Sequence, residues 1–291
     1  MAKSCFLKLL SAAWLWLGWM ASAPAMDIGA WSCTGTCGTS GADGVVTLSP
    51  VAGSASYGWI STNGSSQTGL VPPGIVAATG VGATNGSTIV SPSFTASSGQ
   101  ALSFYFNYVT SDGSGTYGDF AWVRLLNAST GSEVAILFTA RTSPAGDTVP
   151  GYNMPPLPAG ATLTPASTPV IVDGPGWSAS PFPTGGPLWT PLGAHSGDCY
   201  DAGCGYTGWV RMNYTIPSAG TYKLEFGVVN WSDQDFDSGL AFDGASIGGT
   251  AIGGLNAAPG AIPTLGQWAQ MALALALLGL GLAGLRVKTR R

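Results

Sequence analysis

The stretch LSFYFNY at residues 102–108 places Leu102, Phe104, Phe106 and Tyr108 at every second position. A period of two puts these four side chains on one face of a β-strand, where they can be buried together. Five further stretches have the length and apolar content of strands, and short runs rich in Gly, Ser and Asp separate several of them. These five stretches are residues 119–126, 133–140, 209–216, 222–228 and 240–247.

The composition agrees with a fold built from short strands. The 291 residues include 44 glycines and 20 prolines, the two poorest helix formers, and no segment outside the two ends shows sustained helical periodicity. A hydrophobic content of 45% and many aromatic residues argue against disorder. We therefore predict an all-β body, an antiparallel β-sandwich in which each of two sheets buries one face.

The N-terminus is typical of a secretory signal peptide over residues 1–25. Lys3 and Lys8 precede an apolar run, and Ala23-Pro24-Ala25 supplies small residues at the expected cleavage position. The alternative is an uncleaved N-terminal anchor, against which the small residues and the proline argue. We expect a signal helix that is removed on export, followed by a secreted domain over residues 26–249.

The C-terminus carries a second apolar segment. Residues 268–285 contain one internal polar position, Gln270, and are long enough to cross a bilayer as a transmembrane helix. Four basic residues follow within residues 286–291, and such residues stay on the cytoplasmic side. A flexible linker over residues 250–261 would join this anchor to the body, which would lie outside the cytoplasm.

Just before this helix stands the tetrapeptide Ile262-Pro263-Thr264-Leu265, followed by Trp268. Residues 262–291 resemble the IPTL-type C-terminal sorting domain, a relative of the PEP-type tails of Gram-negative bacteria, although the residues flanking the tryptophan depart from the family's usual pattern. The resemblance implies recognition by an exosortase-like membrane transpeptidase, which would remove the tail and pass the protein to the cell surface or extracellular matrix. The alternative is an ordinary membrane anchor.

Three segments of the body resemble a family of exported proteins that carry PEP-type or related tails. They are YGDFAW at residues 117–122, CYDAGCGYTGW at residues 199–209 and FDSGLAFD at residues 236–243. This resemblance implies architecture and export, and it implies no particular chemistry. More loosely, the body looks similar to jelly-roll sugar-binding modules.

The charges are unevenly distributed along the chain. Six of the ten basic residues lie in the two end segments, so the body keeps four basic residues against all 14 acidic ones, a net charge of −10. A body this acidic repels nucleic acid, which we exclude as a partner. The same charge attracts cations.

Four cysteines remain after Cys5 is removed with the signal peptide. An even number of cysteines in an exported chain indicates disulfides. Three pairings are open, and the short spacings with intervening glycines favour Cys33–Cys37 and Cys199–Cys204. A zinc site is the competing interpretation, which the spacing and an oxidising compartment disfavour.

Asp233, Asp235 and Asp237 alternate along the chain before a glycine, and Asp243 follows them. Carboxylates in such a pattern can surround calcium, which takes about six to eight oxygen ligands. The helix-loop-helix calcium motif is not matched, because the glycine is displaced and no glutamate follows. We predict a calcium site from these four residues, with a solvated acidic loop as the alternative.

Residues 142–198 contain twelve prolines. So many residues without an amide donor exclude a central strand. We expect this segment to pack across a sheet and to present Trp177 and Trp189 as an exposed pair that stacks on sugar rings. Burial is the alternative for both, because tryptophan is largely buried on average.

No catalytic constellation emerges. The single histidine, His195, has Ser196 and Asp198 beside it, but residues this close in sequence rarely form a triad. Glu133 and Glu225, both in predicted strands, offer a weak glycosidase pair. We expect a non-enzymatic protein with a structural or binding role at the surface or in the matrix. The alternatives are a carbohydrate-binding module with polysaccharide as partner, stabilised by calcium, and a secreted hydrolase.

Overall fold

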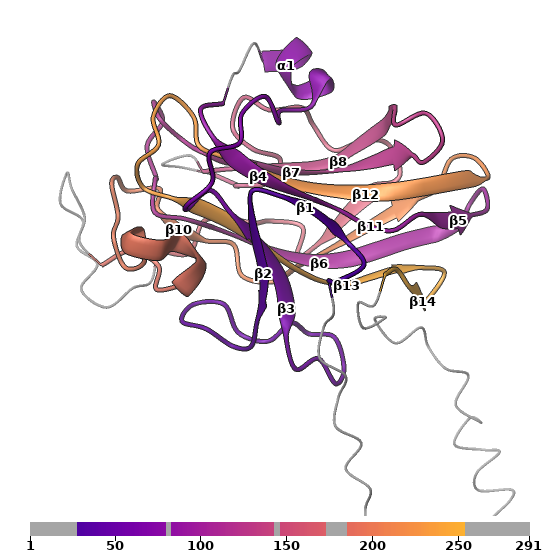
Figure 1. The fold of residues 1–291 in the computed structure, drawn as a ribbon, viewed down its shortest axis with the longest axis horizontal. Helices are drawn as coiled ribbons and strands as arrows, with labels where there is room; N and C mark the ends of the chain where they lie inside the picture. Colours follow the sequence, from indigo (N-terminus) through magenta and orange to yellow (C-terminus); the bar gives the residue numbers. More distant parts are fainter. Residues whose placement is uncertain (1–27, 80–82, 143–145, 173–184, 254–291) are drawn as a thin grey trace, which may run out of the picture.

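The structure is a computed structural model that describes residues 28–79, 83–142, 146–172 and 185–253. In these residues two antiparallel sheets lie face to face, which confirms the predicted all-β sandwich (Figure 1). The predicted signal segment, residues 1–25, and the predicted sorting tail, residues 262–291, lie outside the described residues. Within the described part of the chain, no helix has the length and hydropathy to span a bilayer.

Both sheets are antiparallel throughout. Sheet A has the order β1 (Ser32–Thr34), β4 (Gly86–Val90), β12 (Gly220–Val229), β7 (Phe120–Asn127) and β8 (Glu133–Arg141), and β5 (Phe94–Ala96) also pairs with β12. Sheet B has the order β2 (Thr36–Ser40), β3 (Tyr57–Ser61), β13 (Ser238–Ile247), β6 (Ala101–Thr110), β11 (Val210–Thr215) and β9 (Ala161–Thr164). Two short strands extend sheet B, because β10 (Gly205–Tyr206) pairs with β6 and β14 (Thr250–Ala251) pairs with β13.

All six predicted strands are present, as β6, β7, β8, β11, β12 and β13. Alternate residues of β6 and β12 point into the space between the sheets and are buried there. Aromatic rings fill this space: the ring centroids of Phe106 and Phe138 lie 3.9 Å apart, and those of Phe226 and Phe242 lie 4.4 Å apart. Full burial of one such side chain stabilises the fold by roughly 1.5–3 kcal/mol.

The outer face of sheet A is covered by the short helix α1 (Pro73–Thr79), which lies above β7 and β12 in Figure 1. Ile75 of this helix packs with Trp122, and both are fully buried. The indole of Trp122 lies against β12 at Gly227, where a Cβ atom would come within 2.1 Å of the ring. A glycine is therefore needed at this close approach.

The outer face of sheet B carries a second apolar cluster, and it corrects one prediction. Trp189 is fully buried in this cluster, where its Nε1 donates to the hydroxyl of Tyr57 at 2.9 Å. Its ring lies against Gly239 of β13, where a Cβ atom would come within 2.4 Å of it. The prediction that Trp189 is exposed for stacking on sugars is wrong. Its ring is covered by the apolar cluster, and its one polar atom, Nε1, is hydrogen-bonded to the buried hydroxyl of Tyr57. Trp177 lies outside the described residues.

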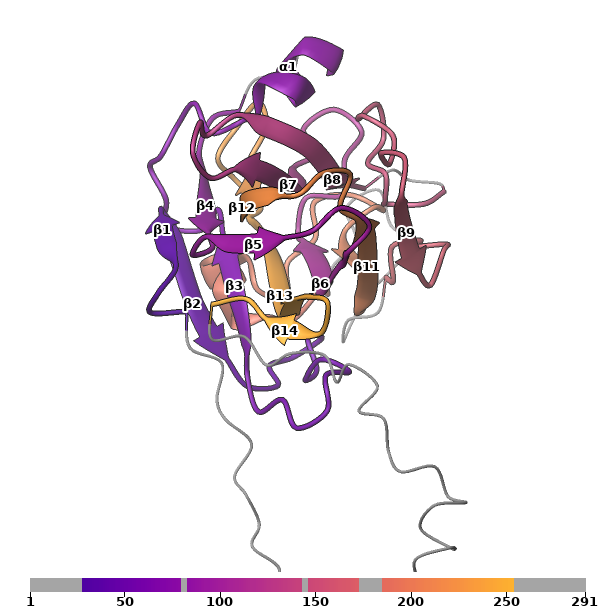
Figure 2. The same ribbon diagram turned by 90° about the vertical axis from the view of Figure 1, so that its right-hand side faces the viewer.

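Both predicted disulfides are present. Cys33–Cys37 joins β1 of sheet A to β2 of sheet B, so it closes one side of the sandwich, where these two strands lie next to each other (Figure 2). Cys199–Cys204 closes a loop that follows the 3-10 helix η1 (Thr190–His195). Disulfides of this kind persist in oxidising compartments.

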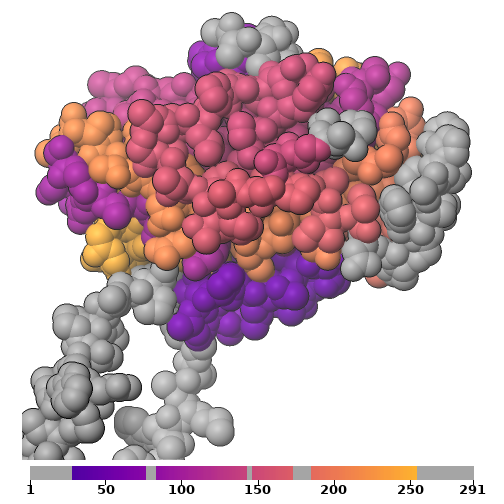
Figure 3. Space-filling view, turned by 180° about the vertical axis from the view of Figure 1, so that it is seen from behind, coloured from indigo at the N-terminus to yellow at the C-terminus, as the bar shows by residue number. Residues whose placement is uncertain are grey.

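The proline-rich segment packs on a sheet only in part: Trp189 and Leu192 lie in the apolar cluster on sheet B, whereas residues 146–172 lie along one side of the sandwich. Seen from behind, its described part up to residue 172 spreads over a broad area of the surface (Figure 3). It contributes β9 at the edge of sheet B, which is compatible with the exclusion of a central strand.

The two ends of the described chain lie next to each other. The indole Nε1 of Trp31 donates to the carbonyl of Gly253 at 2.7 Å, and the amide of Trp31 donates to the carbonyl of Ile28 at 2.8 Å. Residues 250–253 belong to the body, because β14 pairs with β13 and Ile252 is buried. The predicted boundary at residue 249 falls within this packed part, which continues to the last described residue, Gly253.

Candidate functional site

Three loops meet at one end of the sandwich, at the left in Figure 1. Residues 111–119 join β6 to β7, and residues 231–237 join β12 to β13. The pairing of β6 with β13 and of β7 with β12 brings these two loops to the same end. The disulfide loop, residues 195–204, is attached to them because the amide of Tyr200 donates to the carbonyl of Ser111 at 2.9 Å. We call the surface formed by these three ranges the rim.

Asp237 connects the parts of the rim. Its side chain is buried, with Oδ1 accepting from Thr62 Oγ1 at 2.8 Å and Oδ2 lying 2.8 Å from Nδ1 of His195. Its backbone carbonyl accepts from the hydroxyl and the amide of Ser111, at 2.8 and 3.1 Å. A buried carboxylate is costly unless its oxygens are hydrogen-bonded. These bonds meet that need and hold all three loops in place.

A layer of buried polar groups lies behind the rim, where the apolar core ends. The hydroxyl of Ser238 donates to Oδ2 of Asp119 at 2.6 Å and lies 2.6 Å from Oγ1 of Thr110. The amide of Trp231 donates to the other carboxylate oxygen of Asp119 at 3.1 Å. This layer links the two sheets through hydrogen bonds, and so it specifies the position of the loops above it.

Burial shifts the protonation of this layer. Burial raises the pKa of Asp112 to about 6 and raises the pKa of Asp119 well above its usual range, and the carboxylate of Asp112 adds to the second shift. Burial also lowers the pKa of Arg141. The guanidinium carbon of Arg141 lies 4.0 Å from the ring centroid of Trp231, and its Nε donates to the carbonyl of Gly118 at 2.8 Å.

A chain of half-buried rings runs across the rim. The ring centroids of Tyr117 and Tyr200 lie 6.0 Å apart, and those of Tyr200 and Phe236 lie 5.0 Å apart. His195 stacks on the other side of Phe236 at 5.3 Å. All four side chains are partly exposed, so each offers some ring surface to solvent. We call the three rings of Tyr117, Tyr200 and Phe236 the ring chain.

The backbone of the β12–β13 loop is strained. Ser232 has a φ of 75° and Phe236 a φ of 55°, which are left-handed conformations that residues with a Cβ adopt at a cost. Such strain persists only where surrounding contacts hold it, and it gathers at binding and active sites. The ring of Phe236, one of these two residues, contacts the rings of Tyr200 and His195.

Half of the acidic residues of the chain lie in the rim. Asp198 and Asp235 are exposed, while Asp112, Asp119 and Asp237 are buried. The full set of seven is Asp112, Asp119, Asp198, Asp201, Asp233, Asp235 and Asp237. His195 is the one basic residue within the three loops. The rim is therefore a surface of rings and carboxylates with very little positive charge.

The four aspartates of the predicted calcium site are not brought together. Asp233, Asp235 and Asp237 belong to the rim, whereas Asp243 lies within β13, where the serine hydroxyls of residues 49 and 54 bond its carboxylate. A strand advances roughly 3.3 Å per residue, which separates Asp243 from the loop. Among the described residues, no three His, Cys, Asp or Glu side chains form a group that could hold a metal ion. The prediction is wrong for this set.

The catalytic candidates have structural partners. His195 pairs with Asp237 and not with its sequence neighbour Asp198. Glu225 binds Arg124 through both oxygens, at 2.7 and 3.0 Å, and Glu133 lies 3.4 Å from the same guanidinium. Both glutamates are therefore ion-pair partners of Arg124 on sheet A.

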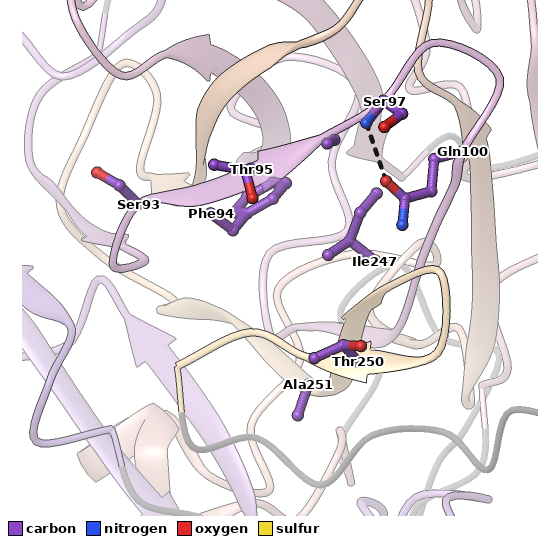
Figure 4. A pocket seen from close by; sticks show the side chains of 9 residues that line it. Ser93, Phe94, Thr95, Ser97, Gln100, Ile247, Thr250 and Ala251 are labelled. Carbon is purple, nitrogen blue, oxygen red and sulfur yellow. Dashed lines mark hydrogen bonds between the residues drawn. The ribbon is translucent and has the colours of Figure 1, made fainter.

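A pocket of about 650 Å³ opens at the opposite end of the sandwich, between β5 and β14 (Figure 4). Phe94, Ile247 and Gln100 are among its lining residues, and Gln100 Oε1 accepts from the amide of Ser97 at 2.9 Å. Among the described residues that line this pocket, none is charged and Phe94 is the one aromatic residue. It therefore offers fewer aromatic and charged side chains for ligand binding than the rim does.

Comparison with known proteins identifies no family for this chain. No protein-family model matches it, and no curated protein matches it. Among solved structures, the enzymatically active domain of bacteriophage CBA120 tailspike protein 4 is 13% identical with a TM-score of 0.29, over 77% of this chain and 20% of that one. The K3 cleaved adhesin domain of Lys-gingipain from Porphyromonas gingivalis w83 is 11% identical with a TM-score of 0.32, over 76% and 95% of the two chains. At TM-scores this low, neither likeness indicates a function.

The ring chain was not predicted from the sequence, but one signal pointed to it. Each of the three segments that resemble exported proteins, residues 117–122, 199–209 and 236–243, supplies one ring: Tyr117, Tyr200 and Phe236 respectively. These three segments meet at the rim.

Proposed function

We propose that this chain is exported, with residues 1–25 removed, and that a helix over residues 268–285 anchors its body outside the cytoplasm. An exosortase-like transpeptidase would then process the tail and pass the body to the surface or matrix. Two disulfides support the oxidising compartment.

We propose further that the body acts by binding and not by catalysis, with the rim as its binding surface. The observation that carries this proposal is the ring chain Tyr117–Tyr200–Phe236, partly exposed and held in place by buried hydrogen bonds to Asp237. Binding surfaces with fixed aromatic side chains and a few polar groups lose little entropy on binding. A jelly-roll module that binds saccharides is the finer form of this proposal.

A glycan array probed with the full-length protein in mild detergent tests the rim. The Tyr200→Ala variant removes the central ring, and we expect it to lose binding to every glycan that the native protein retains. Tyr105→Ala is the matched control, because Tyr105 is also a partly exposed tyrosine but lies on β6 away from the rim. Equal binding by native protein and Tyr200→Ala would remove the rim from the proposal.

A further inference from the structure

The charge of the rim restricts what its ring chain can bind. Four of the seven aspartates in the three loops are exposed or partly exposed, namely Asp198, Asp201, Asp233 and Asp235. The one basic side chain, His195, is paired with Asp237. Arg141, behind them, is buried over Trp231. A surface of this kind repels uronic acids, sulfated sugars and nucleic acids, since no exposed cation on the three loops compensates the carboxylates.

The same surface suits a cation carried on a ring that has an apolar face. Aromatic faces attract ammonium groups, an interaction of about 0.5–1 kcal/mol at exposed sites. Two exposed carboxylates lie close to the ring chain in sequence. Asp198 is two residues from Tyr200, and Asp235 is next to Phe236. Carboxylates accept charge-assisted hydrogen bonds from ammonium groups, which are stronger than bonds to neutral hydroxyls.

The rim is less suited to a basic peptide. A peptide that adds a strand needs a free sheet edge, and the outer strands of the two sheets are β1, β2, β8 and β9, along the sides of the sandwich. A peptide that binds by side-chain anchors needs apolar pockets. The large apolar side chains that are exposed in the described residues, such as Leu48, Ile171 and Leu188, all lie outside the three loops.

We infer that the ligand of the rim is a polysaccharide that carries protonated amino sugars, with sugar rings stacked on the ring chain and their ammonium groups bonded to rim carboxylates. This inference rests on the proposed binding function of the rim and names its ligand class. A deacetylated amino sugar provides both the apolar ring face and the positive charge.

Isothermal titration of the full-length protein with two hexasaccharides tests the charge. The β-1,4-linked glucosamine hexamer and its fully N-acetylated counterpart have the same backbone and differ in the ammonium groups. At pH 6 we expect the glucosamine hexamer to bind about tenfold more tightly, the sum of two or so exposed charge contacts. Raising the salt from 50 to 500 mM should weaken this binding and reduce the difference.

Charge-neutralising variants locate the contact. Asp235→Asn, an exposed change that leaves the fold's buried bonds intact, should weaken binding of the glucosamine hexamer about two- to fivefold. Glu133→Gln is the charge control, because it removes one negative charge from the start of β8 and should leave binding unchanged; the glutamine oxygen can still accept from Arg124. Thermal melting of both variants checks that neither effect comes from unfolding.

The outcomes separate this inference from the function on which it rests. Equal or tighter binding of the acetylated hexamer, lost in Tyr200→Ala, would overturn the amino-sugar assignment and leave the rim as a saccharide site. Binding of a lysine-rich peptide with no binding of either hexamer would overturn the saccharide assignment. Binding of none of these probes, with an empty glycan array, would overturn both proposals.

Discussion

At the scale of single residues, Asp112 couples protonation to the stability of the fold. Its folded-state pKa of about 6 lies above the ordinary value of 3.8 because the side chain is buried. Below pH 4 the carboxyl is protonated in both states. As the pH rises from 4 to 6 the unfolded chain loses the proton first, so the free energy of unfolding falls, and above pH 6 the loss is complete.

The Asp112→Asn variant should remove this pH dependence. Asparagine keeps an oxygen that can accept from the amide of Ser114, as Oδ1 of Asp112 does at 2.9 Å. Between pH 4 and 7 we expect the free energy of unfolding of the native protein to fall by about 2 kcal/mol more than that of the variant. Urea unfolding at pH 4, 5, 6 and 7 measures the difference.

Two details make this comparison sharp. Asp243 also has a raised pKa through burial and remains in the variant, so its contribution cancels in the difference. Asp119 remains too, but the variant removes the part of its raised pKa that comes from the Asp112 carboxylate, and this adds to the difference in the same direction. Asp147→Asn, at an exposed aspartate, is the control and should follow the native curve. Parallel curves for the native protein and Asp112→Asn would contradict the assignment of the shift to Asp112.

At the scale of elements, the two disulfides have different tasks. Cys33–Cys37 joins edge strands of the two sheets, whereas Cys199–Cys204 encloses Tyr200, the central ring of the ring chain. The second loop also packs closely on the β6–β7 loop, since a Cβ atom at Gly113 would come within 1.9 Å of the amide of Cys204. The disulfide loop is therefore part of the proposed binding surface.

Removing each disulfide should separate stability from binding. The double variants Cys33→Ser/Cys37→Ser and Cys199→Ser/Cys204→Ser both open short loops, so each should lose about 2 kcal/mol of stability. Only the second variant removes the disulfide that encloses Tyr200, so only this variant should lose binding to the glycans of the array. Melting temperatures and array binding of the two variants are the measurements. Loss of binding in both variants, or in neither, would contradict this division.

At the scale of the whole molecule, the end of the body that leads to the C-terminus lies away from the rim. Residues 250–253 follow the far end of β13, whose first residue, Ser238, is at the rim. A body held by its C-terminal segment at a membrane would therefore present the rim outward. This arrangement fits a protein that binds a ligand at a distance from its anchor.

Deleting residues 262–265 tests the sorting proposal. In a Gram-negative host with an exosortase-like transpeptidase, we expect the deleted form to stay in the membrane fraction at full mature length. Deletion of residues 256–259, in the predicted linker, shortens the chain equally and should leave processing intact. Mass spectrometry of the C-terminus measures the cleavage. Equal processing of both forms would reduce residues 262–291 to a plain anchor.

The sequence by itself determined the strands and the disulfides. A period of two is a local property, and it identified the buried faces of β6 and β12 without knowledge of their partners. The cysteine pairs are four and five residues apart, so closure of a short turn decides each of them. The acidic charge of the body also follows from composition alone.

Only the tertiary structure decided which polar and aromatic residues meet. The alternation of apolar and polar residues along a strand does not show whether the outer face of its sheet is covered. Trp189 was therefore expected in solvent, whereas it lies buried against Gly239 on the outer face of sheet B. Spacing along one loop suggested that Asp243 joins the other aspartates, whereas strand direction carries it away. The contact of Asp237 with His195 spans 42 residues, because antiparallel pairing of distant strands, and not local sequence, brings the loops of the rim together.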